Sequence, residues 1–151
     1  MEYHGRMVGE GSGMLRMAVP GRCRLDRETE EKLRVALGDC PDLAFAHLAE
    51  VEVEGHEPNL VLFVWVVAPA LRSIRSALNA VCRLVARTLP PDRFLDVVLL
   101  NPAPDILEEV ERVGCLLVER NPEERAQALR ALAAGASEPS PPAGSPWWWP
   151  F

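Results

Sequence analysis

The sequence predicts one α+β domain in which helices pack on a single small mixed β-sheet of about five strands. Apolar residues alternate at period two in some segments and recur at spacings of three and four in others. These segments follow one another in the order βαββαβαβα, without a repeat. A chain of 151 residues is the size of one domain and buries enough surface to fold without disulfides. We expect this domain at residues 14–134.

The chain first forms a predicted strand over residues 14–19 and then a helix over residues 27–37. Asp26 precedes the helix as an N-cap, and Gly38 provides the C-terminal stop. The residues expected to pack against the domain are Leu33, Val35, Ala36 and Leu37.

A β-hairpin is predicted next, because the pattern changes to period two at Leu43. One face of this long strand consists of Leu43, Phe45, His47, Ala49, Val51 and Val53. The other, half-solvated face consists of Ala44, Ala46, Leu48, Glu50, Glu52 and Glu54. A turn at residues 55–59 leads into the continuous apolar run of residues 60–67, which is typical of a central strand covered on both faces.

The second half of the domain is expected to contain three helices and two strands. A helix opens at Pro69 and ends near Arg87, with a buried stripe of Leu71, Ile74, Leu78, Val81, Cys82 and Val85. Residues 94–100 form a strand, residues 105–113 a helix that stops at Gly114, and residues 115–118 a short fifth strand. Asn121 as N-cap, Pro122 and the capping-box residue Glu124 then begin a helix that reaches Ala134.

Both ends of the chain differ from the domain in composition. Residues 1–13 carry four glycines and few apolar side chains, so we expect a flexible N-terminus. Residues 135–151 alternate proline with serine, alanine and glycine before an aromatic cluster, which predicts a disordered tail. This cluster consists of Trp147, Trp148, Trp149 and Phe151.

Composition argues against several classes of protein. The longest apolar run, residues 60–71, is about half the length that crosses a bilayer, and residues 1–13 lack a secretory pattern, so we expect a cytoplasmic protein without membrane contact. A net charge of −6 disfavours nucleic acid as a partner. The four cysteines are widely spaced with no C-x-x-C pair, and the sequence predicts no metal and no cofactor.

Three segments resemble a known family. They run from Leu37 to Leu48 (LGDCPDLAFAHL), from Asn59 to Leu62 (NLVL) and from Leu89 to Leu100 (LPPDRFLDVVLL). Over about residues 14–120, their order and apolar spacing resemble the C-terminal domain of the enhanced serine sensitivity protein (SseB). His47 stands where that domain usually has tyrosine, and Cys115 to Leu117 replace its aromatic ending. The resemblance implies a bacterial, cytoplasmic protein without an assigned catalytic activity.

The first candidate surface is acidic. Glu50, Glu52 and Glu54 are spaced about 7 Å apart along one strand face, where they can meet a basic partner. The alternative is a solvated strand face whose like charges discourage aggregation.

Cys23 is the candidate for chemistry. Arg22, Arg24 and Arg27 flank it just before a helix, and positive charge and the helix dipole would both lower the thiol pKa. The alternative is an incidental thiol. His47 lies on an apolar strand face, where a hydrogen-bonded core histidine is more common than a ligand or base.

The aromatic cluster of the tail is the second candidate surface. The tail either docks on its own domain or a sister copy, anchors another protein, or is dispensable. The sequence therefore predicts a non-catalytic protein-interaction or adaptor module rather than an enzyme. The alternatives are a small enzyme with a reactive Cys23 and an immunity-type protein that masks a basic partner with its acidic strand face.

Overall fold

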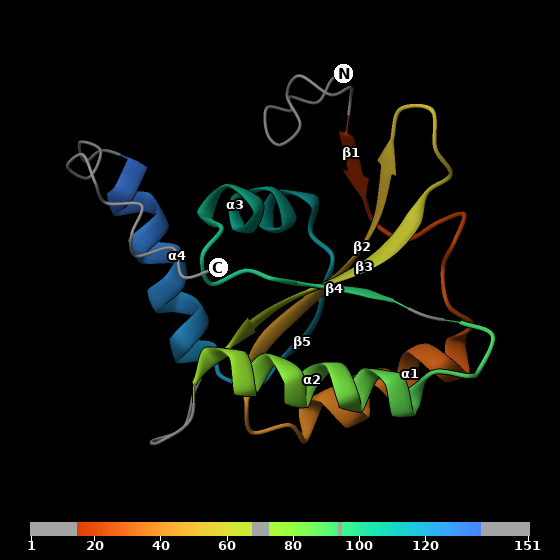
Figure 1. Cartoon of the computed structure of the whole chain (residues 1–151). Helices are drawn as coiled ribbons and strands as arrows, with labels where there is room; N and C mark the ends of the chain where they lie inside the picture. The colour runs from red at the N-terminus through yellow and green to blue at the C-terminus, as the bar shows by residue number, and fades with distance from the viewer. Residues whose placement is uncertain (1–14, 68–72, 94, 137–151) are drawn as a thin grey trace.

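The computed structural model describes residues 15–67, 73–93 and 95–136, and Figure 1 shows the arrangement of its elements. Within these ranges five strands and four helices follow the predicted order, and the prediction of an α+β domain with one mixed sheet is confirmed. The strands are β1 (Leu15–Ala18), β2 (Leu43–Val53), β3 (Asn59–Val66), β4 (Asp96–Leu99) and β5 (Leu116–Glu119). The helices are α1 (Arg27–Gly38), α2 (Ile74–Thr88), α3 (Pro104–Val113) and α4 (Pro122–Ala136).

Strand β2 is the centre of the sheet. It pairs antiparallel with β3, as the predicted hairpin requires. Its other edge is shared by two strands, because β5 lies opposite residues 45–47 and β1 opposite residues 50–53. Strand β4 pairs parallel with β3, so the sheet is mixed.

Each face of the sheet is covered by two helices (Figure 1). On one face Leu33 and Leu37 of α1 and Val81 and Val85 of α2 pack on the sheet, where they contact side chains such as Leu62 of β3. Because the opposite face is covered as well, β3 carries apolar side chains on both of its sides.

The second face carries α3 and α4. Leu107 and Val110 of α3 and Ala128 of α4 pack with Phe45 and Phe63 of the central strands. Only Ala128 is buried among the described side chains of α4, and the C-terminal half of this helix extends past the N-terminal half of α3 (Figure 1).

Two predictions of side-chain direction are wrong. Val35 is 57% exposed, because burial on α1 follows a spacing of four through Thr29, Leu33 and Leu37, and a residue two positions away points to the opposite side. Leu43 packs with the α1 and α2 layer instead of with Phe45, because the register of β2 shifts between these two residues. The same irregularity places Ala44 in the core of the opposite face, and all of residues 43–49 are buried.

The predicted start of α2 at Pro69 is also wrong. The helix begins at Ile74, because the Ser73 hydroxyl accepts a hydrogen bond from the backbone N–H of Ser76 at 3.1 Å and caps the helix. Pro69 and Leu71 lie outside the described residues.

Three other helix ends agree with their sequence signals, whereas Gly38, the predicted stop of α1, is itself the last helical residue and Asp39 is the C-cap. Asp26 accepts from the backbone N–H of Thr29 at 3.3 Å, and Gly114 ends α3 in the left-handed region at φ 78°. Asn121 caps α4 by accepting from the backbone N–H of Glu124 at 3.0 Å. The reciprocal hydrogen bond of the predicted capping box would run from the backbone N–H of Asn121 to the side chain of Glu124. This N–H instead donates to the carbonyl of Ala44 at 2.9 Å.

Asn101 closes the end of the parallel strand pair. Its side-chain amide donates to the carbonyl of Val66 at 2.9 Å, and its side-chain oxygen accepts from the N–H of the same residue at 3.0 Å. The amide therefore makes with Val66 the two hydrogen bonds that a residue of an antiparallel neighbouring strand would make.

The predicted flexible N-terminus, residues 1–13, lies outside the described ranges, and so does the predicted disordered tail, residues 135–151, except for residues 135 and 136, which are helical and not disordered. Helix α4 reaches Ala136, two positions beyond its predicted end at Ala134. In the part of the chain that the structure places, each helix is too short or too polar to cross a lipid bilayer.

Candidate functional site

A polar cluster lies between the sheet and the α3 and α4 layer. We define it as His47 of β2, Glu111 of α3, Cys115 in the loop before β5, Glu119 of β5 and Arg125 of α4. His47 is 1% exposed and Cys115 8% exposed, so the centre of the polar cluster is buried in the core.

Glu111 joins the histidine to the arginine. One of its carboxylate oxygens lies 3.0 Å from His47 Nε2 and accepts from Arg125 Nε at 3.0 Å, and the other accepts from the Arg125 guanidinium at 2.6 Å. Arg125 also donates to Glu119 at 2.7 Å, and its guanidinium lies 6.0 Å from the ring centroid of Phe45. Such two-point pairing fixes the position of both groups.

The protonation states follow from this geometry. Burial lowers the pKa of His47 and outweighs the charge of Glu111, so the imidazole is neutral at neutral pH. Burial alone would raise the pKa of Glu111, but hydrogen bonds from Arg125 and the charges around it lower that pKa. His47 Nε2–H therefore donates to Glu111, and Nδ1 is left as an acceptor 3.9 Å from Cys115 Sγ.

Cysteine, histidine and glutamate thus lie in the relative order of a nucleophile, a base and an orienting acid. The thiol is unsuited to that role, because burial raises the pKa of Cys115 to about 11. Its sulfur also lies 3.8 Å from the carbonyl of Val110, a second weak acceptor. The polar cluster can therefore fix the positions of α3 and α4 on the sheet, whereas a thiolate at Cys115 is strongly disfavoured at neutral pH.

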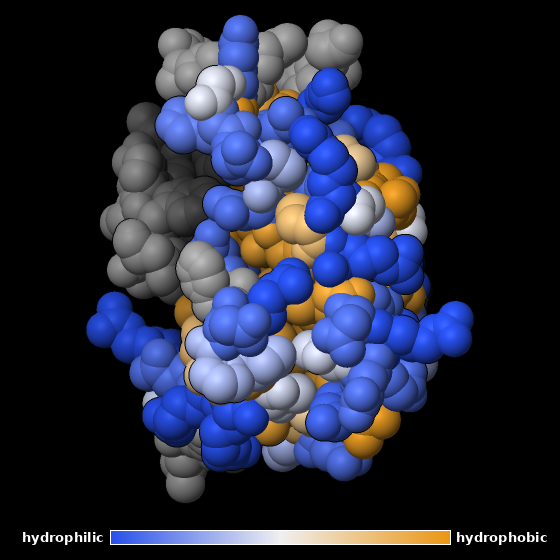
Figure 2. Space-filling model, turned by 90° about the vertical axis from the view of Figure 1, so that its right-hand side faces the viewer, coloured by the Kyte–Doolittle hydropathy of each residue, from blue (hydrophilic) through white to orange (hydrophobic). Residues whose placement is uncertain are grey.

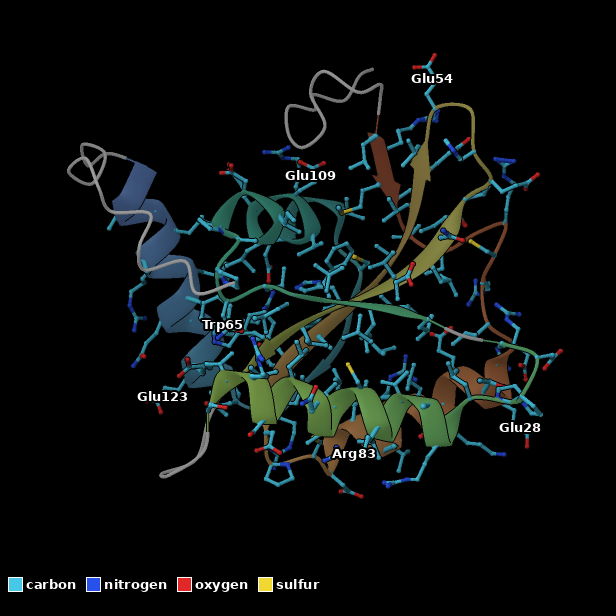
Figure 3. The ribbon with its side chains drawn as sticks, in the orientation of Figure 1. Glu28, Glu54, Trp65, Arg83, Glu109 and Glu123 are labelled. Atoms are coloured by element: carbon cyan, nitrogen blue, oxygen red, sulfur yellow. The ribbon has the colours of Figure 1, made fainter. Side chains whose placement is uncertain are left out.

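An aromatic group continues from the polar cluster toward the start of α4. Phe45 and Trp65 are stacked at 5.8 Å between ring centroids, and Phe45 meets His47 edge-on at 5.9 Å. Trp65 Nε1–H donates to Glu124 of α4 at 3.0 Å, near the end of α4 that carries Glu123 in Figure 3. Helix α4 is thus held by one indole and one guanidinium.

Cys23 lies beside a carboxylate, whereas positively charged arginines were expected around its thiol. Its thiol donates to Glu50 at 3.4 Å, while Arg22 extends to Glu52 at 3.6 Å. Burial and the neighbouring Glu50 raise the pKa of Cys23, so the expectation of a lowered thiol pKa is wrong. Charges adjacent in sequence did not predict which charge faces the thiol.

The acidic residues of β2 differ from one another. Glu50 accepts from the backbone N–H of Gly21 at 2.9 Å and of Cys23 at 3.2 Å, so this side chain orders the loop before α1. Burial opposes ionisation of Glu50, but these hydrogen bonds outweigh it and lower the pKa. Glu52 carries the contact with Arg22, and Glu54 points away from the body at the hairpin tip (Figure 3). The predicted acidic surface is therefore reduced to its outer part.

Figure 2 views the molecule from the side on which the hairpin tip lies in Figure 1. Hydrophilic side chains dominate this side and separate small hydrophobic areas. A charged hollow on the molecular surface is lined by Arg24, Arg27, Glu28, Glu30, Glu31, Lys32 and Arg34. Opposite charges alternate there, which gives the hollow no preference for a ligand of one sign.

A second hollow lies between the N-terminal half of α3 and the C-terminal half of α4, and we call it the α3–α4 groove. Apolar side chains form most of its lining, and two acidic residues of α3 contribute the polar part. The residues used below are Pro104, Asp105, Glu108, Leu129, Leu132 and Ala133.

The predicted aromatic site, Trp147, Trp148, Trp149 and Phe151, lies outside the described residues. Of the described side chains, no group of three or more histidine, cysteine, aspartate or glutamate residues is arranged to hold a metal ion. The sequence pattern did not predict the site residues Glu111, Cys115, Glu119 and Arg125. The one signal for them was His47 on an apolar face, since a buried imidazole needs a partner.

No family model matches the chain, and no curated protein and no solved structure is similar to it. The resemblance to the SseB C-terminal domain stays a prediction.

Proposed function

We propose that this chain is a non-catalytic protein-interaction or adaptor module of a bacterial cytoplasmic protein, similar to the SseB C-terminal domain. The observation that carries the proposal is the α3–α4 groove, a surface hollow with a mainly apolar lining. Apolar side chains that line a groove between two helices favour an apolar segment of a protein as the ligand.

The state of the reactive groups supports a role in binding. The thiols of Cys23 and Cys115 have raised pKa values, and His47 is held neutral between Glu111 and the thiol of Cys115. A nucleophile at neutral pH needs a lowered pKa or an accessible base, and these thiols have the opposite property.

The two alternatives lose support for specific reasons. A small enzyme that uses Cys23 would have to overcome the carboxylate of Glu50 beside the thiol. An immunity-type protein would use the acidic face of β2, but Glu50 orders a loop of its own domain and Glu52 contacts Arg22.

A pair of matched variants tests the proposal. Ala133→Glu places a carboxylate in the α3–α4 groove, and Gln127→Glu places one on an exposed part of the same helix outside the groove lining. Full-length protein and both variants are used to capture partners from a lysate of the organism that encodes the chain, and co-eluting proteins are identified by mass spectrometry.

We expect a partner that binds the full chain and the Gln127→Glu variant and is lost with Ala133→Glu, since burying a charge against apolar side chains is unfavourable. The same proteins in all three samples would contradict the groove as the binding surface. A chain ending at Ala136, the last residue of α4, shows in the same experiment whether the aromatic cluster contributes.

A further inference from the structure

The α3–α4 groove lies close to the point where the described chain ends. Leu129, Leu132 and Ala133 line the groove from α4, and the helix ends at Ala136. At a rise of 1.5 Å per residue, these three residues lie about 5–11 Å along the helix axis from its last residue. A segment that follows α4 therefore starts beside the groove.

The segment is also long enough to turn back. Residues 137–146 connect the end of α4 to Trp147. A fully extended chain of this length spans at most about 35 Å, several times the distance from the helix end to the groove. Trp147, Trp148 and Trp149 can all reach the groove without any change in α4.

The chemistry of the groove fits an indole. Its lining is mainly apolar, and Asp105 and Glu108 of α3 add carboxylates. A tryptophan has a large apolar ring and one N–H donor, so it can cover the apolar lining and donate to a carboxylate at the same time. The domain already contains this pairing, because Trp65 Nε1–H donates to Glu124 at 3.0 Å.

We propose that the α3–α4 groove binds the three tryptophans of the aromatic cluster of the same chain, Trp147 to Trp149, so that the protein covers its own docking surface. The inference rests on the proposed function. Binding within one chain is favoured over binding between copies, because a short linker gives an effective concentration in the millimolar range. A partner with apolar side chains then competes with residues 147–149 for the groove.

The test uses purified protein alone. Tryptophan emission and its quenching by acrylamide are measured for the full chain and for a chain ending at Ala136, whose remaining tryptophan is Trp65. The difference reports the tail, and a free peptide of residues 137–151 gives the exposed reference. Ala133→Glu and Gln127→Glu are measured in the same way, circular dichroism confirms their folding, and light scattering gives the molar mass.

We expect a monomer whose tail tryptophans emit to the blue of the free peptide and are protected from acrylamide. Ala133→Glu is expected to lower the ratio of bound to free tail about tenfold or more, because a carboxylate in apolar contact loses hydration. Gln127→Glu is expected to leave that ratio unchanged.

Three results would overturn the inference: tail emission equal to that of the peptide, equal protection in both variants, or protection that disappears on dilution together with a dimer. Failure here is separable from failure of the proposed function. If the groove variant loses a captured partner while the tail is exposed in the full chain, the docking surface stands and its internal occupant does not.

Discussion

Replacing Arg125 with methionine tests whether the polar cluster holds the domain together. Methionine keeps an unbranched side chain over Phe45 but removes the charge and all donors. Glu111 then loses hydrogen bonds of 2.6 and 3.0 Å, and Glu119 loses one of 2.7 Å. His47 remains the one partner of Glu111 among the contacts described above.

The size of the effect follows from burial. The side chains of Arg125 and Glu111 are 23% and 17% exposed, which places the pair between a surface ion pair and a fully buried one. Surface pairs contribute about 0–1 kcal/mol, whereas removing one partner of a buried pair costs about 3–5 kcal/mol. We expect Arg125→Met to lower the free energy of unfolding by about 3 kcal/mol at neutral pH. With a urea dependence of about 2 kcal/mol per molar, the unfolding midpoint falls by about 1.5 M.

Urea unfolding at pH 7, followed by circular dichroism, measures this change. The matched control is Arg112→Met, which removes contacts with Glu109 at 2.7 Å and Glu108 at 3.4 Å on the outside of α3. Arg112 is 58% exposed, so we expect a loss within about 0.5 kcal/mol. A double-mutant cycle with Glu111→Gln should give a coupling of about 1–3 kcal/mol.

The stability difference between wild type and Arg125→Met is expected to change with pH. The lowered pKa of Glu111 contributes stability that is present above the carboxyl pKa of the unfolded chain and lost as pH falls through the folded-state value. The gap between wild type and Arg125→Met should therefore shrink in acid. Equal midpoint shifts for Arg125→Met and Arg112→Met, or an additive cycle, would refute a structural role of the cluster.

Three further outcomes follow from the structure. Because burial lowers the pKa of His47, the contribution of this residue to stability is full above about pH 6.5 and is lost as pH falls through the lowered value. His47→Phe should therefore make the urea unfolding midpoint less dependent on pH between about pH 6.5 and 5, and an unchanged pH dependence would contradict a neutral imidazole. In thermal unfolding, Gly114→Ala should lower stability by about 1–2 kcal/mol because φ is 78° there, whereas Gly38→Ala should be neutral or stabilising because Gly38 is helical and Val118 lies 4.0 Å from the added methyl. A stability change of the same sign for both variants would contradict this difference in backbone conformation. Alkylation by iodoacetamide at pH 7 should be slower for Cys23 and Cys115 than in the urea-unfolded chain, and a faster reaction at Cys23 would restore the enzyme alternative.

Local signals predicted the order and approximate limits of the elements. Asp26, Gly114 and Asn121 act within one turn of their own position, so the residues that decide a helix end are neighbours in sequence. The start of α2 was misplaced because Pro69 was read as a helix start, while Ser73 performs the capping.

Pairing between distant segments was beyond the sequence pattern. Period two predicts which face of β2 a side chain occupies, but it is the same whether the neighbouring strand is β1, β5 or both. The irregularity between Leu43 and Phe45 then changes the face of two residues without any glycine or proline inside β2.

The polar cluster shows the same limit. His47 implied a buried hydrogen-bond partner, but Glu111 and Arg125 lie 64 and 78 positions further along the chain, on helices that the sequence could not place on one face of the sheet. The error at Cys23 has the same origin, because Glu50 is 27 positions away and outweighs arginines that are adjacent in sequence.

The amide of Asn101 contributes to the alignment of the two parallel strands. Among the described strands, β4 has four residues and pairs with β3 alone, so few backbone hydrogen bonds hold its alignment. Sliding β4 by one residue would move the amide by about 3.3 Å, and both of its bonds to Val66 would break together. The side chain of Asn101 thus requires a fixed distance between the end of β4 and residue 101. An insertion or deletion between β4 and α3 should be tolerated only where it preserves the distance from Leu99 to Asn101.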